Sequence, residues 1–215
     1  RLMAIGTYAE LQTAVANWLD RDDLTDRIPE FIALAEAKMN RNLRISLMEN
    51  VSTAIIMAGG TRDYSLPTGF TGMKEFHLTT SPITPLSYIT PEMMNRMWAG
   101  SNAGRPQAFT LFSDAGTRKI KIGPSPDSAY TTSMLYLKKI DSLSVSNPTE
   151  TMLTENPDVY LYGALLEAEP FLMNDARVQL WAAMLQQVAK DLQDRDIFDR
   201  HSGSALRVMN TTGYP

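Results

Sequence analysis

Few side chains in this sequence are of the types that commonly act as nucleophiles, bases or metal ligands. Its 215 residues include no cysteine and two histidines, His77 and His201. A cysteine nucleophile and a thiolate metal site are therefore excluded, and a serine triad would have to use one of these two histidines. His77 falls in a strand pattern, where a lone histidine is more often structural than a ligand. The sequence thus predicts no catalytic residue and no metal site.

The motifs that hold nucleotides, cofactors or catalytic metals are also absent. The sequence contains no H-E-x-x-H, G-x-x-x-x-G-K-[ST], G-x-G-x-x-G or G-x-S-x-G. We therefore expect no cofactor. The acidic run Asp20-Arg21-Asp22-Asp23 could in principle bind a cation, but three carboxylates in a connection between helices are more often solvated. We interpret it as a polar connection.

Paired carboxylates leave one enzymatic alternative open. Glycoside hydrolysis needs only one carboxyl group as acid and a second as base or nucleophile. The candidates share helical patterns with polar neighbours, which favours a solvated face for each of them. They are Glu10, Glu30, Glu36, Glu167 and Glu169.

The stretch 156–194 holds the strongest helical pattern of the chain. Asn156 is a candidate N-cap with Pro157 at the first helical position, and Pro170 should end that helix near Glu169. Asn174 is then a candidate cap for a second helix that packs antiparallel to the first. The apolar stripe of that second helix comprises Val178, Trp181, Ala182, Leu185, Val188, Ala189 and Leu192.

Two more helices are predicted near the start. Thr7 and Glu10 match the capping box T-x-x-E ahead of a helix from Tyr8 to about Leu19. A second helix should run from residue 26 to residue 43. Neither helical pair can bury its stripe alone, so we expect Trp18 and Trp181 to meet in one bundle.

Between the helical pairs the pattern changes from helical spacing to alternation. The turn Gly59-Gly60 predicts a hairpin between 51–57 and 61–66. A short helix should open at Thr90-Pro91, and further strands are expected at 73–78, 86–89, 107–113, 118–122 and 129–138. The fold class is therefore α+β, with a four-helix bundle formed by residues 1–47 and 152–196 and an inserted β-rich domain at 48–151.

Residues 197–215 are predicted to form an extended C-terminal tail. Asp196 and Arg200 lie four residues apart, which favours a helix persisting to about Phe198. Ser202-Gly203-Ser204 then loosens the chain, and the apolar residues beyond are too few to form a core. We expect this tail to bind a partner through Leu206, Val208, Met209 and Tyr214.

The composition limits the kinds of partner that the protein is expected to bind. Twenty Lys and Arg against 24 Asp and Glu give a net charge of −4, which argues against a protein that grips nucleic acid through a basic face. No apolar run approaches the roughly 18 residues that a membrane span needs, so no membrane is expected. With no catalytic apparatus visible, an assembly or interaction protein is favoured over an enzyme.

Two stretches resemble the head–tail adaptor, or connector, proteins of short-tailed bacteriophages. One is TYAELQTAVANWLDRDDLTDRIPEFIALAEAKMNRNLRI and the other LTENPDVYLYGALLEAEPFLMNDARVQLWAAML. The middle of the chain also fits, with PLSYITPEMMNRM, Gly104-Arg105-Pro106-Gln107 and Gly123-Pro124-Ser125-Pro126 before a strand.

The resemblance implies a structural virion protein of the neck, made in the cytoplasm of the host bacterium. Such adaptors form a ring, usually of twelve copies, which joins the portal protein to the tail nozzle or tail tube and extends the DNA channel. The resemblance also implies passive contact with the genomic DNA and a C-terminal segment that binds the portal. Some related adaptors are credited with peptidoglycan-degrading activity, so a virion-associated glycosidase is the alternative. A cellular binding module unrelated to phage is a third hypothesis.

Overall fold

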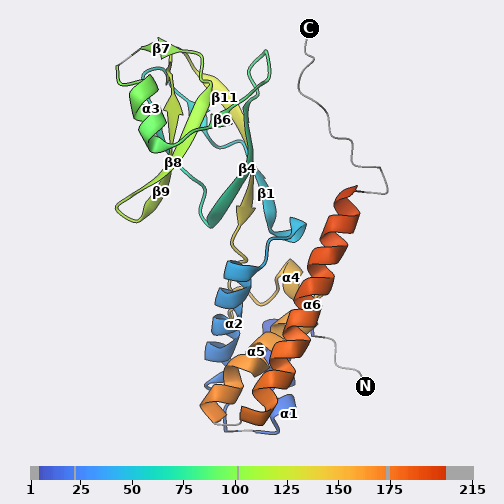
Figure 1. Cartoon of the computed structure of the whole chain (residues 1–215). Coiled ribbons are helices and arrows are strands. Elements are labelled where there is room, and N and C mark those ends of the chain that lie inside the picture. The colour runs from blue at the N-terminus through green and yellow to red at the C-terminus, as the bar shows by residue number, and fades with distance from the viewer. Residues whose placement is uncertain (1–4, 22, 101, 173–174, 202–215) are drawn as a thin grey trace. The chain divides into compact units, whose positions relative to one another are not determined.

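The computed structural model describes residues 5–21, 23–100, 102–172 and 175–201 (Figure 1). The fold is α+β, as predicted. The chain divides into two compact units, and we describe each separately. A helical unit comprises Arg1–Leu47 with Ile140–Pro215, and a β unit comprises Met48–Lys139.

The helical unit is built around α5 (Pro157–Leu172). This helix contacts α1 (Tyr8–Leu19), α2 (Ile28–Asn42), α4 (Thr151–Glu155) and α6 (Asp175–His201). Its side chains Tyr160 and Leu165 are fully buried. A helix covered on several sides accounts for an apolar pattern wider than a single stripe.

The predicted capping box forms at the start of α1. The Thr7 Oγ1 accepts a hydrogen bond from the backbone N–H of Glu10 at 3.3 Å, and Glu10 Oε2 accepts one from the N–H of Thr7 at 3.0 Å. These two bonds satisfy donors that have no partner inside the helix. The helix therefore begins and ends where the sequence pattern predicts.

The prediction that Pro170 ends its helix near Glu169 is wrong. Pro170 lies inside α5, which continues to Leu172. Pro170 removes one helical hydrogen bond, but its fixed φ angle is compatible with a helix, so the helix can continue to Leu172. Asn156 also has another role, because it is the C-cap of the short helix α4 and points its amide nitrogen at the sulfur of Met152, 3.7 Å away. The expected cap Asn174 lies outside the described residues.

Two polar side chains of α2 hold the chain where it returns from the β unit. Asn40 Oδ1 accepts the backbone N–H of Ile140 at 2.7 Å, and Glu36 Oε1 accepts that of Leu143 at 2.8 Å. Glu36 is 3% exposed, so its bond to the backbone forms away from water. The helical unit consequently includes residues 140–151, which the sequence pattern placed with the β-rich part.

The β unit contains two larger sheets. One has the order β1-β11-β4-β5, with β2 also pairing with β11, and the other has the order β3-β9-β8-β6. The two-stranded pair β10 and β7 is parallel. Their bounds are β1 Glu49–Ser52, β2 Ile56–Met57, β3 Asp63–Ser65, β4 Phe70–Leu78, β5 Thr84–Pro85, β6 Ser87–Tyr88, β7 Ala103–Gly104, β8 Ala108–Asp114, β9 Thr117–Gly123, β10 Ser125–Pro126 and β11 Tyr130–Lys138.

The hairpin predicted between 51–57 and 61–66 does not form. The first segment splits into β1 and β2, which both pair with β11, whereas β3 pairs with β9. Alternation identifies a strand and its two faces, but it does not identify the partner. The hairpin β8–β9 does form at Ala115-Gly116, where both residues have positive φ angles of 47° and 79°.

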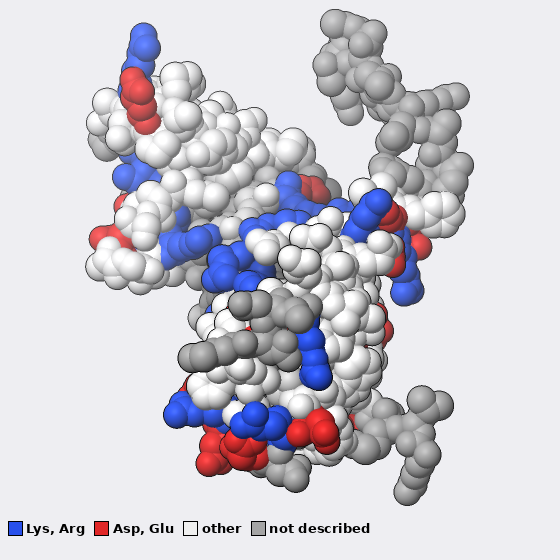
Figure 2. Space-filling model, turned by 60° about the horizontal axis from the view of Figure 1, so that its bottom comes forward, with Lys and Arg blue, Asp and Glu red and all other residues white. Residues whose placement is uncertain are grey.

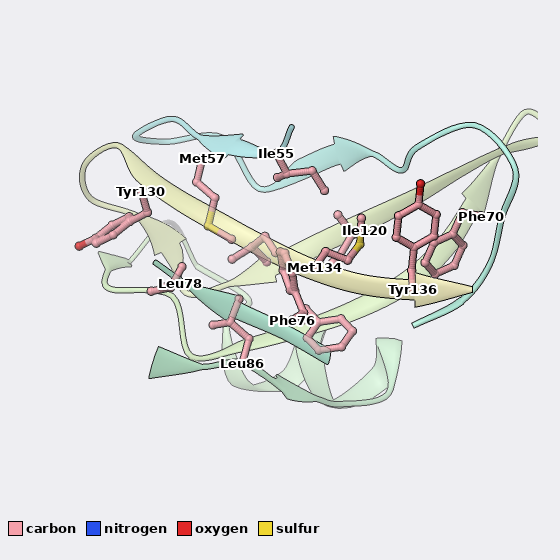
Figure 3. Packing of buried hydrophobic residues seen from close by; sticks show 12 residues of the cluster. Ile55, Met57, Phe70, Phe76, Leu78, Leu86, Ile120, Tyr130, Met134 and Tyr136 are labelled. Atoms are coloured by element: carbon pink, nitrogen blue, oxygen red, sulfur yellow. The ribbon is translucent and has the colours of Figure 1, made fainter. Parts of the chain in front are cut away.

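One apolar cluster fills the space between these strands. Figure 3 shows Phe70 and Tyr136 side by side, and their rings stack with centroids 5.7 Å apart. Phe76, Ile120 and Met134 are each at most 2% exposed. The helix α3 (Pro91–Met97) contacts β8 and buries Met94 completely.

Candidate interaction site

The residues predicted to bind a partner, Leu206, Val208, Met209 and Tyr214, lie outside the described residues. The structure does place the segment from which they leave. Ile197 to His201 belong to α6, so these five residues of the predicted extended tail are helical. The predicted pair Asp196–Arg200 supports this last turn, with Arg200 Nε 2.8 Å from Asp196 Oδ2.

Asp196 also joins the end of α6 to the segment after α2. Its Oδ1 accepts the backbone N–H of Ser46 at 2.7 Å. Burial by itself raises the pKa of Asp196, but the hydrogen bonds from Ser46 and Arg200 and the charge of Arg200 outweigh burial and lower that pKa below its ordinary value. The charged carboxylate of Asp196 therefore anchors the last turns of α6, from which the tail leaves, to the backbone of Ser46.

Two apolar side chains next to this carboxylate face solvent. Ile197 is 55% exposed and Phe198 is 74% exposed. Asp196 also lines a hollow of about 120 Å³ formed by residues of α4, α6 and the segment after α2. Its lining comprises Ile45, Ser46, Leu47, Glu155, Asn156, Leu192, Arg195, Asp196 and Asp199. The base of the tail thus combines a fixed backbone with exposed apolar surface, as interfaces commonly do.

The two tryptophans meet as the helical pattern predicts. The Trp18 and Trp181 ring centroids lie 5.7 Å apart, and Tyr162 stacks on Trp181 at 6.2 Å. Trp181 Nε1 donates a hydrogen bond to Glu169 Oε1 at 2.9 Å. Because Trp18 remains 46% exposed, this aromatic cluster reaches the surface of the helical unit.

Each carboxylate considered for glycosidase chemistry has a structural partner. Glu10 closes the capping box of α1, Glu30 pairs with Arg27, Glu36 accepts the backbone N–H of Leu143, Glu167 pairs with Lys38, and Glu169 accepts the indole N–H of Trp181.

The other chemical candidates are likewise engaged in local structure. In the acidic connection after α1, Asp23 forms two hydrogen bonds of 2.6 Å with Arg21, and Asp20 is the C-cap of α1. His77 Nδ1 lies 3.0 Å from Glu75 on the same strand. Across the described ranges, no three His, Asp or Glu side chains are placed to hold a metal ion. No helix in those ranges is long and apolar enough to cross a membrane.

A second candidate surface lies in the β unit, where a groove of about 370 Å³ opens between β4 and the strands β6 and β8. Phe76 and Phe109 are buried in it, whereas Tyr88 is 57% exposed and packs edge-on against Phe109 with centroids 5.7 Å apart. The sequence pattern did not reveal this groove, because its walls come from strands whose pairing the pattern does not specify.

Comparison with known proteins decides the family. Residues 6–209 match the family model described as SU10 adaptor protein. The chain belongs to this family. No curated protein matches the sequence.

The match covers both helical segments and the whole β unit, and it ends within the predicted tail. The SU10 adaptor chain is therefore a structural adaptor protein of a bacteriophage, and its family indicates a place at the neck of the virion. The resemblance noted in the sequence is thus confirmed at the level of the family.

Proposed function

We propose that this SU10 adaptor forms a ring that joins the portal protein to the tail nozzle or tail tube and extends the DNA channel. The family match over residues 6–209 is the observation that carries the proposal. We propose twelve copies in the ring, a four-helix bundle as its helical core, and the β unit as an insertion in that bundle. A ring requires contacts between two different surfaces of the chain, repeated until they close.

In this proposal the tail contacts the portal or a neighbouring copy through Leu206, Val208, Met209 and Tyr214. Truncation after His201 removes the tail but keeps the Asp196–Arg200 pair intact. The truncated protein should keep the melting temperature of the full chain, because none of its described contacts is removed. Its particles should lose DNA or lack tails, and normal infectious particles would contradict this role.

Contact with DNA is proposed to be passive. Residues 48–139 carry nine Lys or Arg and six Asp or Glu, so the β unit is cationic although the chain is anionic. Several of these cations are neutralised locally, since Lys74 pairs with Glu49 and Lys119 lies 2.6 Å from Asp114. Figure 2 shows basic side chains gathered in places on a face that is largely uncharged.

Electron microscopy of the purified chain mixed with its portal tests the ring. The expected result is a ring of the adaptor seated on the portal, with copies sharing more than about 1,000 Å² per contact. DNA binding is tested in parallel by titration with duplex DNA at several salt concentrations. Tight duplex binding with a steep salt dependence would contradict passive contact.

A further inference from the structure

The outer edge of β4 is unpaired over a short window. On one edge β4 pairs with β11, and on the other edge β5 pairs only with His77 and Leu78. At the opposite end, Arg118 Nη1 donates to the carbonyl oxygen of Thr71 at 3.1 Å. Within the described ranges no strand pairs with this outer edge at 72–75. Such an edge can hydrogen-bond an added strand.

The unpaired window opens on the apolar groove of the β unit. Met73 and Phe76 of β4 form one wall, and Tyr88 and Leu111 form the other. A backbone edge beside side-chain pockets is the arrangement by which proteins bind an extended peptide, because the backbone supplies affinity and the pockets select side chains. Since β5 closes one end of the window and Arg118 covers the other, the window suits a short extended segment.

The chain itself contains a segment of matching character. Fourteen residues follow His201, which can span at most about 50 Å when extended. Leu206 and Val208 are two residues apart and would lie on one face of a strand, while Arg207 would lie on the other. Arg207 is the only charged residue of this segment.

Charge complementarity also favours this segment. Glu75 and Phe76 pair with consecutive residues of β11, so their side chains lie on opposite faces of the sheet although both residues border the groove, and the irregular register at Lys74 brings Met73 to the face of Phe76. The Glu75 side chain is 60% exposed. An added strand with Leu206 and Val208 in the groove would therefore place Arg207 on the same outer face as this carboxylate.

We infer that the C-terminal segment of one copy adds as a strand to β4 of a neighbouring copy, with Leu206 and Val208 in the groove. This inference rests on the proposed ring, in which neighbouring copies lie side by side. Exchange of a terminal segment is a contact between two different surfaces, and it closes when the ring closes. The occupant of the groove is thus a second copy of this chain.

Disulfide cross-linking tests the inference cleanly, because the chain has no cysteine of its own. Full-length Tyr88→Cys and Val208→Cys variants, carrying different affinity tags, are mixed, assembled on the portal and oxidised mildly. The expected product is a disulfide-linked pair of differently tagged chains. Val51→Cys replaces Tyr88→Cys in the control, because Val51 is 62% exposed on β1, which lies beyond β11 from β4 and does not border the groove.

Each outcome is decisive. A ring that forms on the portal without this cross-link, or with an equal yield from the Val51 control, overturns the inference and leaves the proposed function standing. Absence of any ring by electron microscopy overturns the proposed function instead. A Tyr88→Cys/Val208→Cys double variant that links within one chain would show that the tail binds its own copy.

A charge exchange adds a second readout. Glu75→Arg should lower the cross-linking yield by up to about fivefold, the size expected of an exposed ion pair. Adding Arg207→Glu to the tail variant should restore the yield. Unchanged cross-linking yields in both cases would show that Glu75 and Arg207 do not interact, and the proposed orientation of the added strand would be wrong.

Discussion

Replacing Trp181 with Ala should destabilise the helical unit strongly. Trp181 is 7% exposed, and its ring packs against Trp18 and Tyr162. Removing a buried tryptophan side chain typically costs about 3–5 kcal/mol, since the burial is lost and a cavity remains. The aromatic contacts belong to this loss, so they are not counted again.

The hydrogen bond to Glu169 adds a separable part. Glu169 is fully buried and accepts the indole N–H at 2.9 Å, so the substitution leaves a buried acceptor without its donor. An unsatisfied buried group costs about 1–3 kcal/mol. Trp181→Phe keeps one aromatic ring but removes this donor and part of the buried volume, so its loss should lie between this amount and the loss of Trp181→Ala.

Urea denaturation followed by far-ultraviolet circular dichroism measures both losses. The helical signal is appropriate because removal of a tryptophan alters fluorescence directly. Phe198→Ala is the control, because Phe198 lies on the same helix and is 74% exposed. It should leave the unfolding midpoint nearly unchanged. A Trp181→Ala midpoint equal to that of the wild type would refute the packing of α6 onto α1 and α5.

Three further substitutions test local parts of the account. Asp196→Ala should cost about 1.5–3 kcal/mol at neutral pH, because charge-assisted hydrogen bonds are lost. The folded-state pKa of Asp196 lies below the unfolded value of about 3.9, so the stability difference should persist above pH 3.9. In acid-denaturation curves the difference should disappear as the pH falls through the folded-state pKa. Gly123→Ala should cost about 1–3 kcal/mol in a thermal melt, because the added methyl group overlaps the half-buried ring of Trp98 and the buried sulfur of Met94, whereas Gly100→Ala meets open space and should not. Thr7→Ala should cost about 1 kcal/mol through loss of the α1 cap, and an unchanged midpoint would show the cap to be energetically silent.

The helices were predictable because their signals are local. The capping box at Thr7 and Glu10 and the 3.6-residue spacing of apolar side chains require no knowledge of distant partners. The contact between Trp18 and Trp181 followed from two stripes that could not be buried alone. The end of α5 was harder, because a proline near a helix end removes one bond only, and neighbouring packing decides whether the helix continues.

Strand partners were not predictable in the same way. Alternation marked β4, β8, β9 and β11, yet whether β3 pairs with β2 or β9 depends on contacts between residues far apart in the sequence. The groove beside β4 is formed by strands whose pairing was not predicted, so the groove was not predicted either. Glu36 and Asn40 lie four residues apart and therefore on one side of α2, but their spacing does not identify the backbone N–H groups of Leu143 and Ile140 that they accept.

The most direct test of the central claim is electron microscopy of the intact virion neck. We predict a ring of this chain between the portal and the tail, with its helical and β units each fitting the density. A neck in which the portal contacts the tail directly, or in which another protein occupies the ring, would contradict the account.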